Sequence, residues 1–181
     1  GASLAAKWSW LNQGSAARTV GSGIGSMSIP SNGDNIRAII QAAPSGDFTV
    51  MCKHSVLAPF VNYFGGGLIL YNNTSGKLIY LGQSVRAVNS YMQVAKWNST
   101  TSFSAEPYLI LWNPCRYIKI TRVSGVLTFY VSDDGVAWVN VFSENQSVFL
   151  SSVTHIGLFT QRNNTDGKIY YADFDWFRVT E

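Results

Sequence analysis

The chain has 181 residues and a net charge of +3, with 13% charged and 14% aromatic residues. This length fits one ordinary domain with a full hydrophobic core. The 13 basic residues are scattered, which argues against nucleic acid as a partner because phosphates require clustered Lys and Arg. No run of about 18 apolar residues occurs, so we expect no membrane-spanning helix.

Short β-branched and aromatic runs are broken by Gly, Asn, Asp and Ser roughly every eight to twelve residues, a pattern typical of antiparallel sandwiches and barrels. The predicted strands are 16–21, 25–29, 36–43, 47–56, 66–72, 77–82, 89–97, 107–113, 116–123, 126–132, 136–142, 154–162 and 168–179. The best helical candidate is 144–150. We expect an all-β, two-sheet antiparallel β-sandwich over residues 1–181, as a single domain excised from a longer protein.

The acidic pair Asp133–Asp134 precedes Gly135, between two runs of period-two alternation. That pattern predicts a hairpin connection, since Asp hydrogen-bonds within its own turn and Gly tolerates positive φ. Paired catalytic carboxylates would instead project from rigid strands into a cleft. A structural calcium ion bound here remains an alternative. Otherwise we expect no cofactor and no metal.

The other reactive residues give weak signals. Cys52 and Cys115 are too few for a disulfide framework; we interpret them as buried thiols, with one disulfide as the alternative. His54 and His155 have no G-x-S-x-G nucleophile motif to serve. The Gly-x-Gly spacing in 21–26 lies between two β runs, which favours a loop over a phosphate site.

An ordered series of motifs carries a family resemblance: "GDF" at 46–48, "GLILY" at 67–71, "KITR" at 119–122, "FYVSDDGVAW" at 129–138, "IGL" at 156–158 and "FDWFRV" at 174–179. The series resembles concanavalin A-like jelly-roll domains, in particular the C-terminal accessory domain of bacterial β-xylosidases and arabinofuranosidases and its phage-borne or free-standing relatives. The resemblance implies two stacked antiparallel sheets and a non-catalytic role.

Enzymes of the same fold place three acids on one strand in an E-x-D-x-x-E pattern, which this sequence lacks. Its only alternating acids are Asp173 and Asp175. Two carboxylates at this spacing could serve acid–base chemistry, but we expect them to bind backbone, Lys or Arg. We therefore predict no catalytic residue.

A saccharide site needs an aromatic platform beside planar polar groups. Alternation over 89–97 places Tyr91, Gln93 and Trp97 on one strand face, which suits an exposed, sugar-facing surface. The other candidate ligand-binding residues are Trp112 and Asn113 at a strand end, Tyr117 and Lys119 beyond them, and Tyr63 in the loop 60–67. Trp138 and Trp176 are expected to be structural.

These observations favour a carbohydrate-binding module of a phage structural or receptor-binding protein, or of a secreted bacterial glycoside hydrolase. We expect it outside the cell or on a virion surface. Its other partners could be copies of itself or domains of the parent protein. A structural or oligomerisation domain without ligand, and a glycosidase or polysaccharide lyase of this fold, remain open alternatives.

Overall fold

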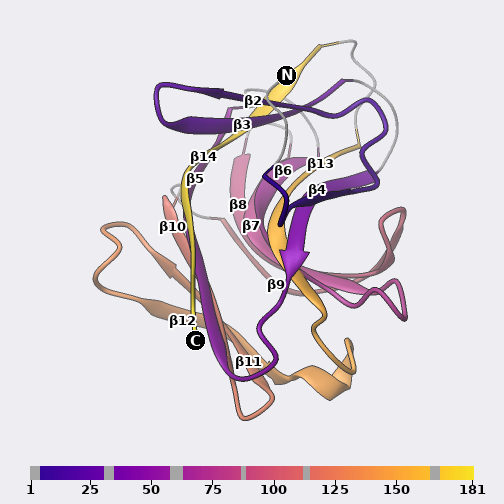
Figure 1. Ribbon diagram of the computed structural model, residues 1–181. Helices are drawn as coiled ribbons and strands as arrows, with labels where there is room; N and C mark the ends of the chain where they lie inside the picture. The colour runs from indigo at the N-terminus through magenta and orange to yellow at the C-terminus, as the bar shows by residue number, and fades with distance from the viewer. Residues whose placement is uncertain (1–4, 31–34, 58–62, 87–88, 112–114, 164–167) are drawn as a thin grey trace.

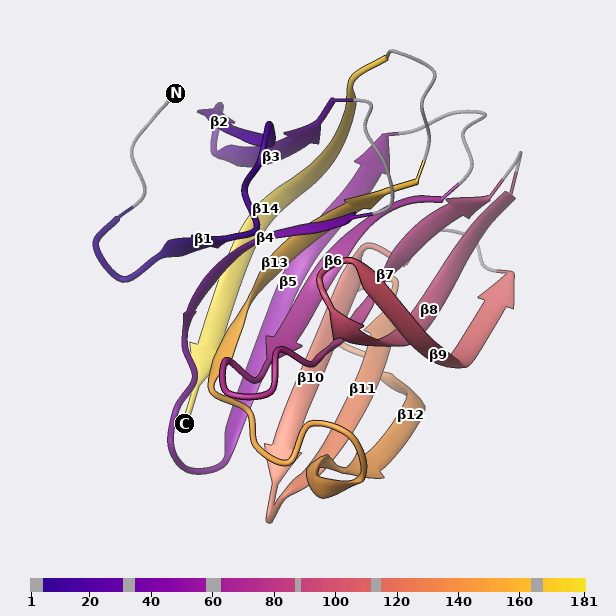
Figure 2. The same ribbon diagram turned by 90° about the vertical axis from the view of Figure 1, so that its right-hand side faces the viewer.

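The computed structural model describes residues 5–30, 35–57, 63–86, 89–111, 115–163 and 168–181. Two seven-stranded antiparallel sheets stack as two layers (Figures 1 and 2). The first, sheet A, has the order β1 (Ser9–Leu11), β4 (Asn35–Ala42), β13 (His155–Arg162), β6 (Phe64–Tyr71), β7 (Leu78–Arg86), β8 (Asn89–Ser99), β9 (Ser102–Leu111). The second, sheet B, has the order β12 (Val139–Asn145), β11 (Val126–Ser132), β10 (Tyr117–Val123), β5 (Phe48–Leu57), β14 (Tyr170–Thr180), β3 (Ile24–Ile29), β2 (Ala17–Gly21).

The expected all-β sandwich is confirmed, and the main core lies between its sheets. Alternate residues of β5 and β10 point inward, among them Val50, Cys52 and Ile120. Leu68 and Leu81 meet them from sheet A. This arrangement follows from the period of two along each strand, which sends successive side chains to opposite faces.

Sheet A buries apolar side chains on its outer face as well. Ile69, Tyr80, Trp97 and Phe159 belong to a second buried cluster on this face. The rings of Tyr80 and Phe159 lie 4.2 Å apart between their centroids. A sheet face that is buried without a third layer must be covered by its own large side chains. The packing of these side chains therefore determines the shape of the outer surface of sheet A.

The predicted strands match the observed ones apart from a few differences at their ends and at the N-terminal side. The short strand β1 was not predicted, and β9 begins at Ser102 instead of 107. The connection before β9 contains Ser and Thr instead of Gly or Pro, so it gives little turn signal. The helical candidate 144–150 is reduced to one 3-10 turn, Gln146–Val148.

The acidic pair lies in the connection between β11 and β12, as predicted. Asp134 Oδ1 accepts hydrogen bonds from the backbone N–H groups of Val136 and Ala137 and from the Ser132 hydroxyl. These donors lower the pKa of Asp134 below its ordinary value. Gly135 has φ +77°, a conformation that favours glycine. The carboxylate therefore stabilises a turn.

Cys52 and Cys115 are free and buried, which confirms the thiol interpretation. Both belong to the core between the sheets. Burial raises the pKa of the Cys52 thiol well above its ordinary value, so this thiol is unreactive at neutral pH.

Candidate functional site

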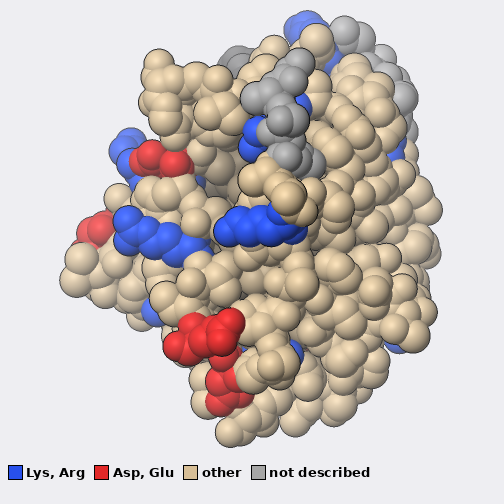
Figure 3. Space-filling view, viewed as in Figure 1, with Lys and Arg blue, Asp and Glu red and all other residues tan. Residues whose placement is uncertain are grey.

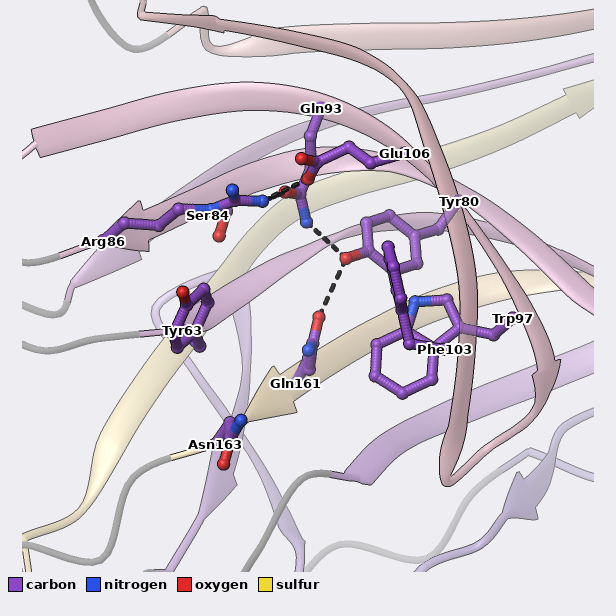
Figure 4. Close-up of a pocket in the computed structure, with 10 residues that line it drawn as sticks. All are labelled: Tyr63, Tyr80, Ser84, Arg86, Gln93, Trp97, Phe103, Glu106, Gln161 and Asn163. Carbon is purple, nitrogen blue, oxygen red and sulfur yellow. Dashed lines mark hydrogen bonds and ion pairs between the residues drawn. The ribbon is translucent and has the colours of Figure 1, made fainter.

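A pocket of about 350 Å³ opens on the outer face of sheet A (Figure 4). Its size lies at the lower end of the range for small-molecule sites. Strands β7, β8, β9 and β13 and the segments next to β6 and β13 supply its lining: Tyr63, Tyr80, Ser84, Arg86, Gln93, Trp97, Phe103, Glu106, Gln161 and Asn163. These residues, which are far apart in the sequence, meet here because the strand order and register of sheet A bring their strands together.

Two glycines in the middle of sheet A allow neighbouring strands to approach each other closely. Gly67 and Gly82 face each other across β6 and β7. A Cβ atom on Gly67 would lie 2.2 Å from the Leu81 carbonyl oxygen, and one on Gly82 would lie 2.3 Å from the Gly66 oxygen. Only glycine fits such a close approach. The pair therefore allows the close backbone spacing of β6 and β7.

Aromatic rings form two sides of the pocket. Phe103 is 52% exposed and stacks edge-on against Trp97, with 5.6 Å between the ring centroids. Tyr63 is 45% exposed and lies on the other side of the pocket from these rings. Two accessible rings on either side of a cavity offer the apolar contact that a flat ligand needs.

A chain of hydrogen bonds crosses the pocket between those sides (Figure 4). The Arg86 guanidinium donates to Gln93 Oε1 at 2.6 Å, and the Gln93 amide donates to the Tyr80 hydroxyl. Tyr80 in turn donates to Gln161 Oε1 at 2.8 Å. Each donor orients the next group, so the two amides are held in fixed orientations.

Arg86 is fixed from four directions. It forms an ion pair with Glu106 as well as the bond to Gln93. Its guanidinium carbon lies 5.5 Å from the Tyr63 ring centroid and 5.6 Å from that of Tyr91, within the range of cation–π attraction. These contacts hold the guanidinium in place through Nη2 and its ring contacts, while its buried Nε has no hydrogen-bond partner.

Several predicted site residues come together here. Tyr63, Gln93 and Trp97 line the pocket, and Tyr91 contacts it through Arg86. The expectation of an exposed indole at Trp97 is wrong, because its residue is only 1% exposed beneath Phe103. The exposed ring is Phe103, which sequence reasoning missed. It is the direct cross-strand partner of Trp97, and that pairing depends on an unpredicted turn.

Other predicted site residues lie elsewhere. Tyr117 and Lys119 alternate with the buried Ile118 and Ile120, so they face outward from sheet B. There Tyr117 packs near Trp176 and Lys119 lies 4.1 Å from the Trp138 ring centroid. Trp112 and Asn113 lie outside the described residues. The predicted set therefore does not form one site.

The alternating acids line a different pocket, in sheet B. Lys53 Nζ donates to Asp175 Oδ2 at 2.6 Å, as expected for a structural pairing. Asp173 Oδ1 is buried without a hydrogen-bond partner. A β-bulge between Phe174 and Trp176 interrupts the regular alternation of side chains along the strand that carries the two acids. Within the described part of the chain, no group of three His, Cys, Asp or Glu side chains could hold a metal ion.

Charge is sparse on the surface. Figure 3 shows one face that is mostly neutral, with acidic and basic side chains in small separate groups. Among the described residues, no helix is long and apolar enough to cross a membrane.

Comparison with known proteins supports the fold. No family model and no curated protein sequence matches the chain. Among solved structures, the GH43 protein BlXynB from Bacillus licheniformis is similar with a TM-score of 0.75 and 16% identity, over 98% of this chain and 37% of that one. The CBM2 module of the evolved Dit of Lactobacillus casei BL23 phage J-1 has a TM-score of 0.61 and 13% identity, over 96% and 93% of the two chains.

The VIP36 exoplasmic/lumenal domain, in a form bound to Ca²⁺ and Man3GlcNAc, is similar with a TM-score of 0.63 and 11% identity, over 96% of this chain and 83% of that one. The chain thus spans about a third of the glycosidase and most of the phage module and the lectin domain. These similarities identify the fold as a concanavalin A-like jelly roll. At such low identity they show the fold alone.

Proposed function

We propose that the chain is a non-catalytic carbohydrate-binding module whose site is the pocket on the outer face of sheet A. The observation that carries the proposal is the arrangement of Phe103 and Tyr63 on either side of the oriented amides of Gln93 and Gln161. Sugars present flat C–H faces edged by hydroxyl groups, and such a pocket offers rings for the faces and amides for the hydroxyls. The phage module and the lectin domain of similar fold support the same class of ligand.

A module of this kind acts where glycans are displayed, so we propose that it works outside the cell or on a virion surface. We expect no bond cleavage by the module. The carboxylate in the pocket, Glu106, is paired with Arg86 and has no second acid beside it among the described lining residues. A glycosidase of the usual mechanism needs two carboxyl groups flanking the scissile bond.

The test is binding to an immobilised panel of plant, bacterial and animal glycans, followed by a Phe103→Ala variant. We expect the variant to bind about tenfold or more weakly, because losing a stacking ring removes about 1.4 kcal/mol or more. Phe103 is half exposed, so its removal should leave the fold intact. Tyr171→Ala is the matched control, since Tyr171 is an exposed ring on sheet B; it should bind like the wild type. Failure of the wild type to bind any glycan would contradict the proposal.

One observation favours a second candidate function, self-assembly. Strand β9 ends the order of sheet A and exposes Leu109, Ile110 and Leu111. An apolar edge strand is a template for pairing with another chain. Sedimentation analysis would show a stable oligomer, dissociated by Leu111→Lys, if this edge joins copies of the chain.

A further inference from the structure

The pocket holds two opposite charges that neutralise each other. Of its described lining residues, only Arg86 and Glu106 are charged, and they form an ion pair with each other. The remaining polar groups are amides and hydroxyls, which are neutral. The described lining of the pocket therefore carries no net charge.

An acidic sugar would bind weakly to such a site. Its carboxylate would lose water and meet a guanidinium whose charge Glu106 already balances. The Arg86 bonds to Glu106 and Gln93 both use Nη2, and its buried Nε has no hydrogen-bond partner. Burying an anion without a free cationic partner is unfavourable, and a second carboxylate nearby adds repulsion. A neutral sugar meets neither penalty.

We propose that Glu106 determines the specificity of this pocket, by occupying Arg86 so that neutral saccharides are accepted and uronic or sialic acid residues are rejected. The inference rests on the proposed carbohydrate-binding function and names the ligand class of that site. Rejection here works by repulsion and by withholding a partner, which is a common route to discrimination between similar ligands.

The geometry also predicts how the preference can be reversed. In a Glu106→Gln variant, Arg86 keeps its bond to Gln93 and its contacts with the rings of Tyr63 and Tyr91. The guanidinium therefore stays in place but loses its counter-charge. A guanidinium in that state binds carboxylates through charge-assisted hydrogen bonds, so the variant should gain affinity for acidic saccharides.

The experiment measures binding of wild type and Glu106→Gln to matched neutral and acidic pairs: galactan with polygalacturonate, arabinoxylan with glucuronoxylan, and N-acetyllactosamine with and without terminal sialic acid. We expect the wild type to favour the neutral member of the pair it binds. We expect the variant to gain about tenfold or more for the acidic member, and the gain to fall as NaCl rises from about 50 to about 500 mM.

Asp175→Asn is the matched control, because it removes the carboxylate of the Lys53 ion pair outside this pocket. It should leave the preference unchanged. A wild type that prefers acidic glycans, or a folded Glu106→Gln variant without any gain, would overturn the inference and leave the proposed function standing. A wild type that binds neither class would overturn both.

Discussion

At the scale of single residues, the neighbours of each acidic side chain determine its role. Asp134 stabilises a turn, Glu106 neutralises Arg86, and Asp175 pairs with Lys53. The turn could be predicted, because local spacing determines it. A backbone, Lys or Arg partner could be expected for Asp175, but the identity of that partner and of the partner of Glu106 could not be predicted. Lys53 lies 122 residues from Asp175, and Arg86 lies 20 residues from Glu106.

The pKa of His54 shows how burial affects a single titratable group. Burial between the sheets lowers its pKa from 6.5 to about 4, against a smaller opposing effect of its hydrogen bond to the Arg116 carbonyl. The unfolded chain binds a proton near pH 6.5, while the folded chain stays neutral until about pH 4. The contribution of His54 to stability is therefore complete above about pH 6.5 and is lost as the pH falls towards 4.

We predict that protonation of His54 lowers the free energy of unfolding by roughly 3 kcal/mol between about pH 7 and about pH 4. Urea titrations across this range measure it, and a His54→Gln variant should show a flatter dependence on pH. Should that variant not fold, the titration of the His54 ring by NMR gives the pKa directly. An ordinary value near 6.5 would contradict the prediction.

At the scale of elements, alternation and turn residues predicted most strands, with their boundaries within a few positions. They failed where polar residues other than Gly or Pro form the turn, as between β8 and β9. That failure hid Phe103, one of the two exposed rings of the pocket. The central strands β6 and β7 depend instead on glycines whose role only the register reveals.

Gly67→Ala should destabilise the protein by about 1–3 kcal/mol, because the new methyl group would overlap the backbone of β7 and force the strands apart. Gly46→Ala is the matched control. A Cβ atom there meets nothing within 4 Å, so its denaturation midpoint should stay at or slightly above that of the wild type. Equal midpoints for Gly67→Ala and the wild type would show that the sheet relaxes easily.

At the scale of the whole molecule, two layers were expected and are confirmed. The sequence could not say which outer face would carry the pocket lined by aromatic rings, because both sheets present aromatic side chains outward. On sheet B, Lys119 and Arg178 lie against the rings of Trp138 and Trp176. On sheet A, five separate segments converge on one pocket. That convergence is a property of strand order, which no local pattern encodes.

The most direct test of the proposed location is an NMR titration that follows the indole N–H signals of the tryptophans with the best-bound neutral oligosaccharide of the panel. Trp97 lines the proposed pocket, whereas Trp138 and Trp176 do not. We predict that the Trp97 signal shifts on binding while the signals of Trp138 and Trp176 remain in place. A shift confined to Trp138 and Trp176 would put the ligand on sheet B and contradict the proposed site.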